Sequence, residues 1–167
     1  RQSNTKIFQS KECRDIIRIL KAVSHPGRET ARIGALYSNF FSIPHDPVSK
    51  HKDYADDQSF IDLLNQWHGL AERNRYGELF RDITIRSGFM ARQLDRIDGE
   101  QTLATVDQIF EIILETVARG TTGLQQVIEM LERLHGGSVV PDGVQSGIRL
   151  AEAKDAVQIL TIHKSKG

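Results

Sequence analysis

The fold of this 167-residue chain is decided by the stretch 102-TLATVDQIFEIILETV-117. Its apolar residues recur at spacings of three and four, which places them along one face of an α-helix. They are Leu103, Val106, Ile109, Phe110, Ile113, Leu114 and Val117. Gly120 ends the pattern. Because such a helix is stable only when its apolar stripe is covered, we expect other amphipathic helices to pack around it.

Similar stripes occur on both sides of this stretch. The first helix begins at Lys11 after the N-capping Ser10 and ends at His25-Pro26-Gly27. The other predicted helices cover residues 28–37, 56–70, 76–87, 89–97 and 121–134, while residues 42–53 read as a loop and 98–100 as a turn. The sequence therefore predicts an all-α helical bundle of about six or seven helices.

The C-terminal part differs from the rest of the chain. Residues 136–148 contain four glycines, one proline and two serines, a composition typical of a flexible linker. Residues 157–162 then form a nearly continuous apolar run rich in β-branched side chains, as in a strand buried inside a parallel sheet. One strand makes no sheet, so its partners are expected outside this sequence. We therefore expect short extended ends on a helical domain.

Composition places the chain among ordinary globular proteins. Apolar residues make up 39% and charged residues 26%, and no apolar run reaches the roughly 20 residues of a membrane span. The start, Arg1-Gln2-Ser3-Asn4, has neither an initiator methionine nor a signal-peptide apolar region, so we expect a segment of a longer protein. The single cysteine, Cys13, lies on an apolar stripe and suits a buried thiol in a reducing cytoplasm.

Charge is balanced overall but unevenly distributed. The formal net charge is zero, yet residues 1–50 carry nine Lys and Arg against four acids, whereas residues 99–135 carry two Arg against six acids. A basic region suits a phosphate backbone and an acidic region a protein partner, although solvated helix faces give the same pattern. Possible DNA-binding residues in the middle of the chain are Arg73, Arg75, Arg81, Arg86, Arg92 and Arg96. A mixed solvated surface is the alternative.

Several other kinds of site are not indicated by the sequence. No G-x-x-x-x-G-K-[ST] phosphate-binding loop is present, and the six histidines and one cysteine form no zinc-binding spacing, so no metal, cofactor or catalytic residue is expected in this chain. Asp53, Asp56 and Asp57 lie where acids cap a helix. Trp67 fits the inward stripe of its helix, whereas Tyr54 and Tyr76 at element edges are freer to stack on bases.

The last eleven residues, 157-VQILTIHKSKG-167, resemble motif V of the UvrD-like superfamily I helicases, most closely the RecB type found in exodeoxyribonuclease V. Residues 6–26, from Lys6-Ile7-Phe8 through Pro26, are similar to the segment that enters the helical 2B insertion of those enzymes. The resemblance implies three regions. Residues 1–24 would be the edge of the RecA-like 2A domain with a leading helix, 25–148 the 2B-like domain, and 149–167 the return strand with motif V.

The resemblance also implies a function. The parent protein would be a bacterial, cytoplasmic, ATP- and Mg-dependent DNA helicase and exonuclease, without a membrane role, that repairs double-strand breaks with RecC-like and RecD-like subunits. Thr161, His163, Lys164, Ser165 and Lys166 would contact the DNA backbone, and small donors with ammonium groups at a strand end suit that task. The 2B-like domain would guide the duplex, dock partner subunits and regulate unwinding, while this chain alone would be inactive.

Two alternatives remain open at this point. Family members commonly begin the helix after the middle turn with Gly-Glu-Arg-Arg, whereas this chain has Gly99-Glu100-Gln101-Thr102, so an AddA-type helicase-nuclease is the nearest alternative. A helical protein-interaction module without DNA contact, docking through its acidic helices at residues 103–134, is the other.

Overall fold

The computed structural model describes residues 4–43, 48–120 and 122–137. Within these ranges it contains nine helices and no strand, which confirms the all-α prediction. The helices are α1 (Asn4–Ile7), α2 (Lys11–Ser24), α3 (Glu29–Leu36), α4 (Val48–Ala55), α5 (Gln58–Glu72), α6 (Tyr76–Arg86), α7 (Phe89–Leu94), α8 (Gly99–Ala118) and α9 (Leu124–His135). The predicted return strand and its linker fall largely outside the described residues.

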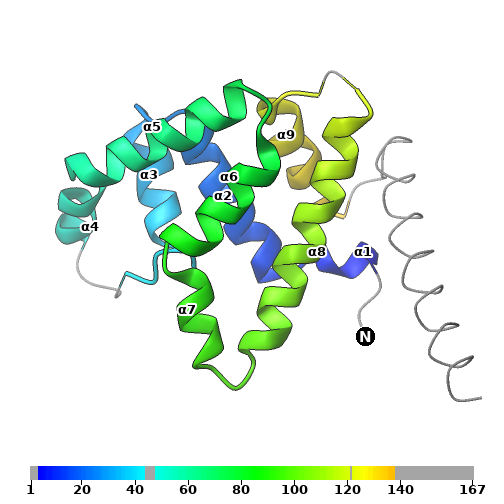
Figure 1. Cartoon of the computed structure of the whole chain (residues 1–167). Helices are drawn as coiled ribbons and strands as arrows, with labels where there is room; N and C mark the ends of the chain where they lie inside the picture. Colours follow the sequence, from blue (N-terminus) through cyan, green and yellow to red (C-terminus); the bar gives the residue numbers. More distant parts are fainter. Residues whose placement is uncertain (1–3, 44–47, 121, 138–167) are drawn as a thin grey trace, which may run out of the picture.

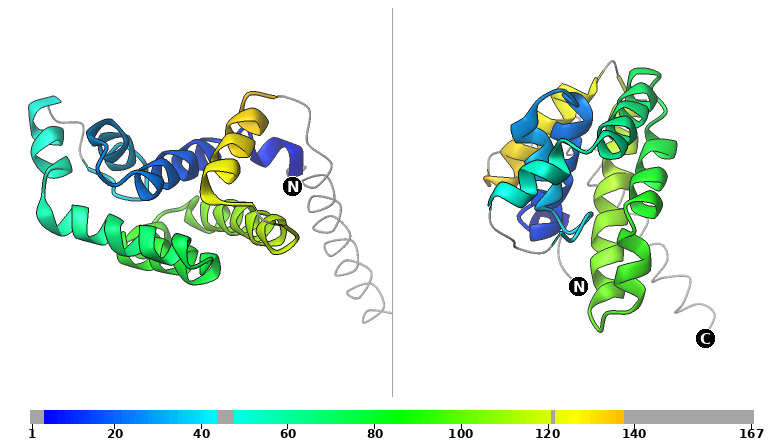
Figure 2. Two further views of the ribbon diagram at one scale, coloured as in Figure 1. Left: turned by 90° about the horizontal axis from the view of Figure 1, so that it is seen from above. Right: turned by 90° about the vertical axis from the view of Figure 1, so that its left-hand side faces the viewer.

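The helices form two layers that pack face to face (Figures 1 and 2). Helices α2, α3 and α9 lie in one layer and α5 to α8 in the other, with α4 at one end. Helix α2 packs against α3, α5, α8 and α9. Its side chains Ile16, Ile19 and Leu20 are completely buried, so the two layers share one continuous hydrophobic core centred on α2.

The stripe that predicted the fold is in the core, as expected. In α8, Val106, Ile109, Phe110 and Ile113 are buried. The ring of Phe110 stacks on that of Phe80 from α6, with centroids 4.3 Å apart. This stacking stabilises the fold beyond the contribution from burial of the two rings. Helix α8 begins earlier than predicted, because the expected turn at 98–100 already contributes its first residues.

Helix α4 corrects the prediction of a loop over residues 42–53. Its sequence shows little apolar periodicity, which is why a loop was predicted. Tertiary contacts to the end of the helix stabilise it instead. The buried guanidinium of Arg32 donates to the carbonyl oxygens of Ala55 (2.7 Å) and Pro26 (2.8 Å) and lies 3.1 Å from Asp56 Oδ1. Arg32 therefore fixes the end of α4 against the start of α3.

The N-terminal end also differs from the extended backbone that we expected. Residues 4–7 form a short helix, and Ile7 and Phe8 are buried in the core. His135 Nδ1 lies 2.9 Å from the carbonyl oxygen of Phe8 and so links α9 to this segment. The boundaries at residues 24 and 148 stay predictions, although α2, assigned to the first region, lies at the centre of the bundle.

The aromatic and cysteine predictions have mixed outcomes. Trp67 is completely buried and so is Cys13, whose pKa is raised by burial to about 12. Tyr54 is exposed as expected, but the prediction for Tyr76 was wrong, because only 4% of this residue is exposed. In the described part of the chain, no helix is both long and apolar enough to cross a membrane.

Residue Gly99 permits the close approach of α7 and α8. A Cβ atom at this position would lie 1.6 Å from the backbone carbonyl oxygen of Gln93. We therefore expect Gly99→Ala to lower the free energy of unfolding by about 3 kcal/mol or more in urea titrations. Gly34→Ala is the matched control, since its Cβ would meet nothing within 4 Å; it should raise stability by about 0.5–1 kcal/mol. Equal effects of the two substitutions would contradict this explanation.

Asp15 is a buried carboxylate that predicts a pH dependence of stability. Burial raises its pKa, despite the backbone N–H of Asn39 and the charges of Arg14 and Arg18. The pKa of Asp15 is higher in the folded state than in the unfolded state. Ionisation of Asp15 therefore destabilises the fold as the pH rises from the unfolded-state pKa through the folded-state pKa. Asp15→Asn should therefore gain stability relative to the wild type between about pH 3 and pH 7, and urea titrations at both pH values test this.

Asp57 provides the opposite control. It caps α5, and its pKa is lowered by the hydroxyl of Ser59 and the backbone N–H groups of Ser59 and Phe60. Its stabilising contribution is present above the unfolded pKa and is lost on acidification. Asp57→Ala should therefore be less stable than the wild type at neutral pH, with a difference that shrinks in acid. The same pH trend for both variants would refute the assignment for Asp15.

Candidate nucleic-acid interface

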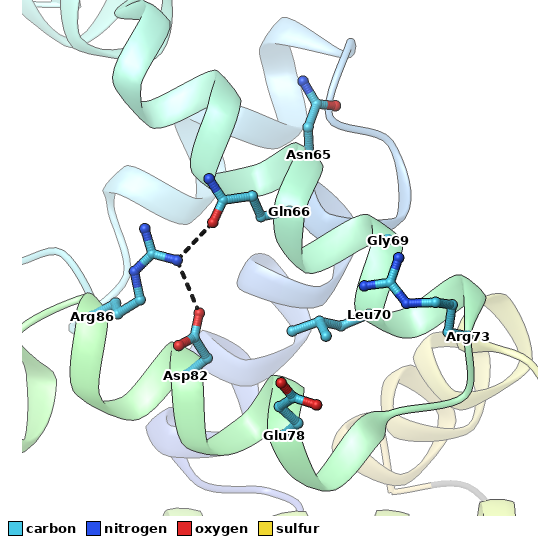
Figure 3. Close-up of a pocket in the computed structure, with 8 residues that line it drawn as sticks. All are labelled: Asn65, Gln66, Gly69, Leu70, Arg73, Glu78, Asp82 and Arg86. Carbon is cyan, nitrogen blue, oxygen red and sulfur yellow. Dashed lines mark hydrogen bonds and ion pairs between the residues drawn. The ribbon is translucent and has the colours of Figure 1, made fainter.

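The six arginines predicted to contact DNA lie on or beside three helices. Arg73 and Arg75 lie in the turn after α5, Arg81 and Arg86 on α6, Arg92 on α7, and Arg96 just after α7. Two of them, Arg73 and Arg86, line one open groove of about 420 Å³ between α5 and α6 (Figure 3). The groove is also lined by Asn65, Gln66, Gly69, Leu70, Glu78 and Asp82.

A buried tryptophan anchors the charged network in this groove. Trp67 donates its indole N–H to Asp82 Oδ2 at 2.7 Å. The same oxygen lies 3.3 Å from Arg86 Nη1, which also donates to Gln66 Oε1 at 2.8 Å (Figure 3). Asp82 is thus fixed from the core side and holds Arg86 on the solvent side. The charge of Arg86 is therefore partly neutralised before any ligand arrives.

The remaining groove charges also balance. Arg75, which does not line the groove itself, forms an ion pair with the groove residue Glu78, 2.6 Å apart. The Arg73 guanidinium lies beside Gly69 (Figure 3), where the missing side chain leaves it room. Two arginines and two acids line the groove, so the groove has no formal net charge. This arrangement suits a polar contact surface better than strong phosphate binding.

Arg92 has a structural task. Its guanidinium is partly buried and donates to the carbonyl oxygens of Ser87 (3.1 Å), Asn39 (3.0 Å) and Phe40. Burial lowers its pKa. These bonds tie α7 to the segment that follows α3, on the other layer of the bundle. The guanidinium of Arg92 is therefore occupied by backbone carbonyl groups and connects the two layers.

The last two arginines lie on the surface. Arg96 Nε is 3.3 Å from Asp98 Oδ1, whereas Arg81 is exposed and forms no ion pair with a described residue. The structure thus brings Arg73 and Arg86 together at one groove, which the other four arginines do not line. Their role in DNA binding stays a prediction, as does that of Thr161, His163, Lys164, Ser165 and Lys166, which lie outside the described residues.

The acid partners of these arginines were missed at the sequence level, although their spacing was readable. Asp82 and Arg86 are four residues apart and Arg75 and Glu78 three apart, the distances at which side chains meet on a helix. The role of Arg92 had no local signal, because Asn39 and Phe40 lie more than fifty residues away in the sequence. The described residues contain no group of three or more His, Cys, Asp and Glu arranged for a metal ion.

Comparison with known proteins connects this helical domain with helicase/nuclease enzymes. No protein-family profile matches the chain. It is 22% identical to the A subunit of the ATP-dependent helicase/nuclease of Lactobacillus helveticus over 96% of its length. The proteins of the same name from Leuconostoc mesenteroides and Listeria monocytogenes are each 24% identical, over 96% and 99% of the chain.

The chain spans about 15% of the length of these relatives. All three are A subunits by name, so the comparison agrees with a helicase/nuclease origin and with the AddA-type alternative. The RecB-type prediction stays a prediction.

Whether the groove between α5 and α6 contacts DNA is testable through Asp82. In Asp82→Asn the amide oxygen still accepts from Trp67, while Arg86 loses its counter-charge. If the groove meets DNA, this variant should bind a fluorescein-labelled forked DNA about threefold more tightly at low salt in anisotropy titrations. Asp62→Asn on α5 is the charge-matched control, because Asp62 bonds only the nearby Gln58 among described residues. Equal affinities of the two variants would exclude the groove from the interface.

Proposed function

We propose that this chain is the 2B-like helical domain of an AddA-type ATP-dependent helicase/nuclease that acts in DNA double-strand-break repair. The observation that carries the proposal is the similarity to the A subunits of helicase/nuclease enzymes over 96% to 99% of the chain in several bacteria. AddA is preferred to RecB because these relatives all carry the name of the A-type polypeptide. The all-α fold agrees with a helical insertion.

The helicase and nuclease chemistry would reside in the rest of the parent protein. The chain covers about 15% of its relatives and has no phosphate-binding loop in its sequence. ATP and Mg would bind elsewhere in the parent, and the chain alone would be inactive. Motif V at residues 157–167 would couple nucleotide hydrolysis to DNA contact, with Lys164 and Lys166 facing phosphates.

The described helices would supply a rigid body beside that motor. The two layers share one core through α2, so the bundle would move as a unit when it guides the duplex, docks a partner subunit or regulates unwinding. The partner would be the second polypeptide of an AddA-type enzyme, in place of the RecC-like and RecD-like subunits of a RecB-type enzyme. The relatives are named as subunits, which supports an assembly.

A protein-interaction module without DNA contact is the second candidate. One observation favours it, namely an exposed apolar row at the end of the molecule formed by α7. Met90 and Leu94, four residues apart on α7, are 40% and 72% exposed, and Ile97 in the turn that follows is fully exposed. Ile85 at the end of α6 is 56% exposed. Exposed apolar groups of this kind are frequent at protein interfaces.

Substitution of the motif V lysines tests the proposed function in the longer protein that contains this chain. Lys164→Ala/Lys166→Ala should reduce single-strand-stimulated ATP hydrolysis and unwinding of a tailed duplex by about tenfold at 0.1 M salt, as expected for loss of two phosphate contacts. ATP hydrolysis and strand separation are measured side by side.

The matched control is Lys6→Ala/Lys52→Ala, which removes the same charge from two exposed positions. It should retain both activities. A longer protein without DNA-stimulated ATP hydrolysis would refute the helicase assignment and leave the protein-interaction module as the better explanation. Equal losses in both double variants would refute the role of motif V.

A further inference from the structure

A row of basic residues follows the outer face of α2 and continues past its end. The first four members are separated by three, four and three residues, which keeps them on one side of α2, and the last two follow in the turn after it. They are Lys11, Arg14, Arg18, Lys21, His25 and Arg28, and together they are called the α2 basic stripe. His25 is the C-cap residue of α2 and Arg28 is the N-cap residue of α3.

The packing of α2 explains why these residues lie together. Helices α3, α5, α8 and α9 cover the other sides of α2 (Figure 2), where eight of its residues are buried. Only a narrow outward strip is left for long charged side chains. Lys11, Arg14, His25 and Arg28 are exposed, and the side chains of Arg18 and Lys21 are 38% and 47% exposed.

Acidic neighbours neutralise only part of the stripe. Arg18 lies 3.9 Å from the buried Asp15, and Lys21 lies 3.3 Å from Glu132 of α9. Arg14 and Arg28 form no ion pair with another described residue. At the end of α2, the side chains of Lys21, His25 and Arg28 line an open groove of about 460 Å³ against α9. The charge of Lys11 also acts on Asp98, so the positive charge that the stripe retains is greatest at Arg14 and Arg28.

We infer that the α2 basic stripe binds the phosphodiester backbone of single-stranded DNA without regard to base sequence. The identity of the nucleic acid rests on the proposed function, whereas the anionic chemistry rests on the stripe itself. From Lys11 to His25 α2 rises about 21 Å, which is long enough for several successive phosphates of an extended single strand to lie beside it. The charged groups follow one another at about 5 Å along the axis.

A single strand fits this row better than a duplex does. A flexible strand can lie along a straight helix, whereas each strand of a duplex winds away around its axis. Base stacking is expected to contribute little, because the stripe contains no Phe, Tyr or Trp side chain. Binding should therefore be electrostatic and strongly dependent on salt.

The test compares two variants of the 167-residue chain that lose the same charge. Arg14→Gln/Arg28→Gln removes the two unpaired arginines of the stripe, and Arg119→Gln/Arg133→Gln removes two exposed arginines near the ends of α8 and α9. Binding of a fluorescein-labelled oligothymidine is followed by anisotropy at a series of salt concentrations. Circular dichroism verifies that both variants remain helical.

The stripe variant should bind about tenfold more weakly at 0.1 M salt, and the slope of log affinity against log salt should decrease by about 1.4. The control variant should match the wild type. Equal weakening in both variants, or no binding of the wild type at low salt, would overturn the inference. So would tighter binding of a blunt duplex, or equally strong competition by polyglutamate, which would point to an acidic protein as the ligand.

These outcomes are separate from the test of the proposed function. A longer protein that fails to hydrolyse ATP would remove the helicase assignment and leave oligonucleotide binding by the stripe unaffected. Conversely, a stripe that does not bind DNA would leave a DNA-stimulated ATPase in the longer protein intact as support for the helicase/nuclease assignment.

Discussion

The burial of α2 on most of its circumference is the constraint on which the rest of the structure depends. Four helices pack against it, and its residues Cys13, Ile16, Ile19 and Leu20 are completely buried. A helix so enclosed has room for charged side chains on one narrow strip only. The same constraint therefore produces the two-layered bundle and collects the basic residues of α2 in a row on its outer surface.

A second set of contacts fixes how the two layers meet. In the segment after α3, the carbonyl oxygens of Asn39 and Phe40 accept hydrogen bonds from the guanidinium of Arg92. The backbone N–H of Asn39 donates to Asp15 of α2. The rings of Phe40 and Phe89 lie 4.6 Å apart beneath these bonds. A short connection without regular structure is thereby held from both sides, which satisfies its backbone groups where water is largely excluded.

Helical periodicity predicted the long elements, because residues such as Val106, Ile109 and Ile113 are buried for a reason that is local in sequence. It failed for α4, whose end is fixed by Arg32 from a different helix. Within the candidate site, the pairing of Asp82 with Arg86 could be predicted from their spacing, whereas the hydrogen bonds of Arg92 to distant carbonyl groups could not. Sequence reasoning thus identified the charged side chains but not what each of them contacts, since that depends on contacts between distant segments.

The single tryptophan of the chain gives this domain a built-in optical reporter. The indole of Trp67 is completely buried and hydrogen-bonded to Asp82, which in turn holds Arg86 at the rim of the α5–α6 groove. Indole emission responds to the polarity and charge around the ring. Occupation of the groove would therefore alter the intrinsic fluorescence of the domain, whereas a ligand on the outer face of α2 lies on the opposite layer and would leave the emission unchanged.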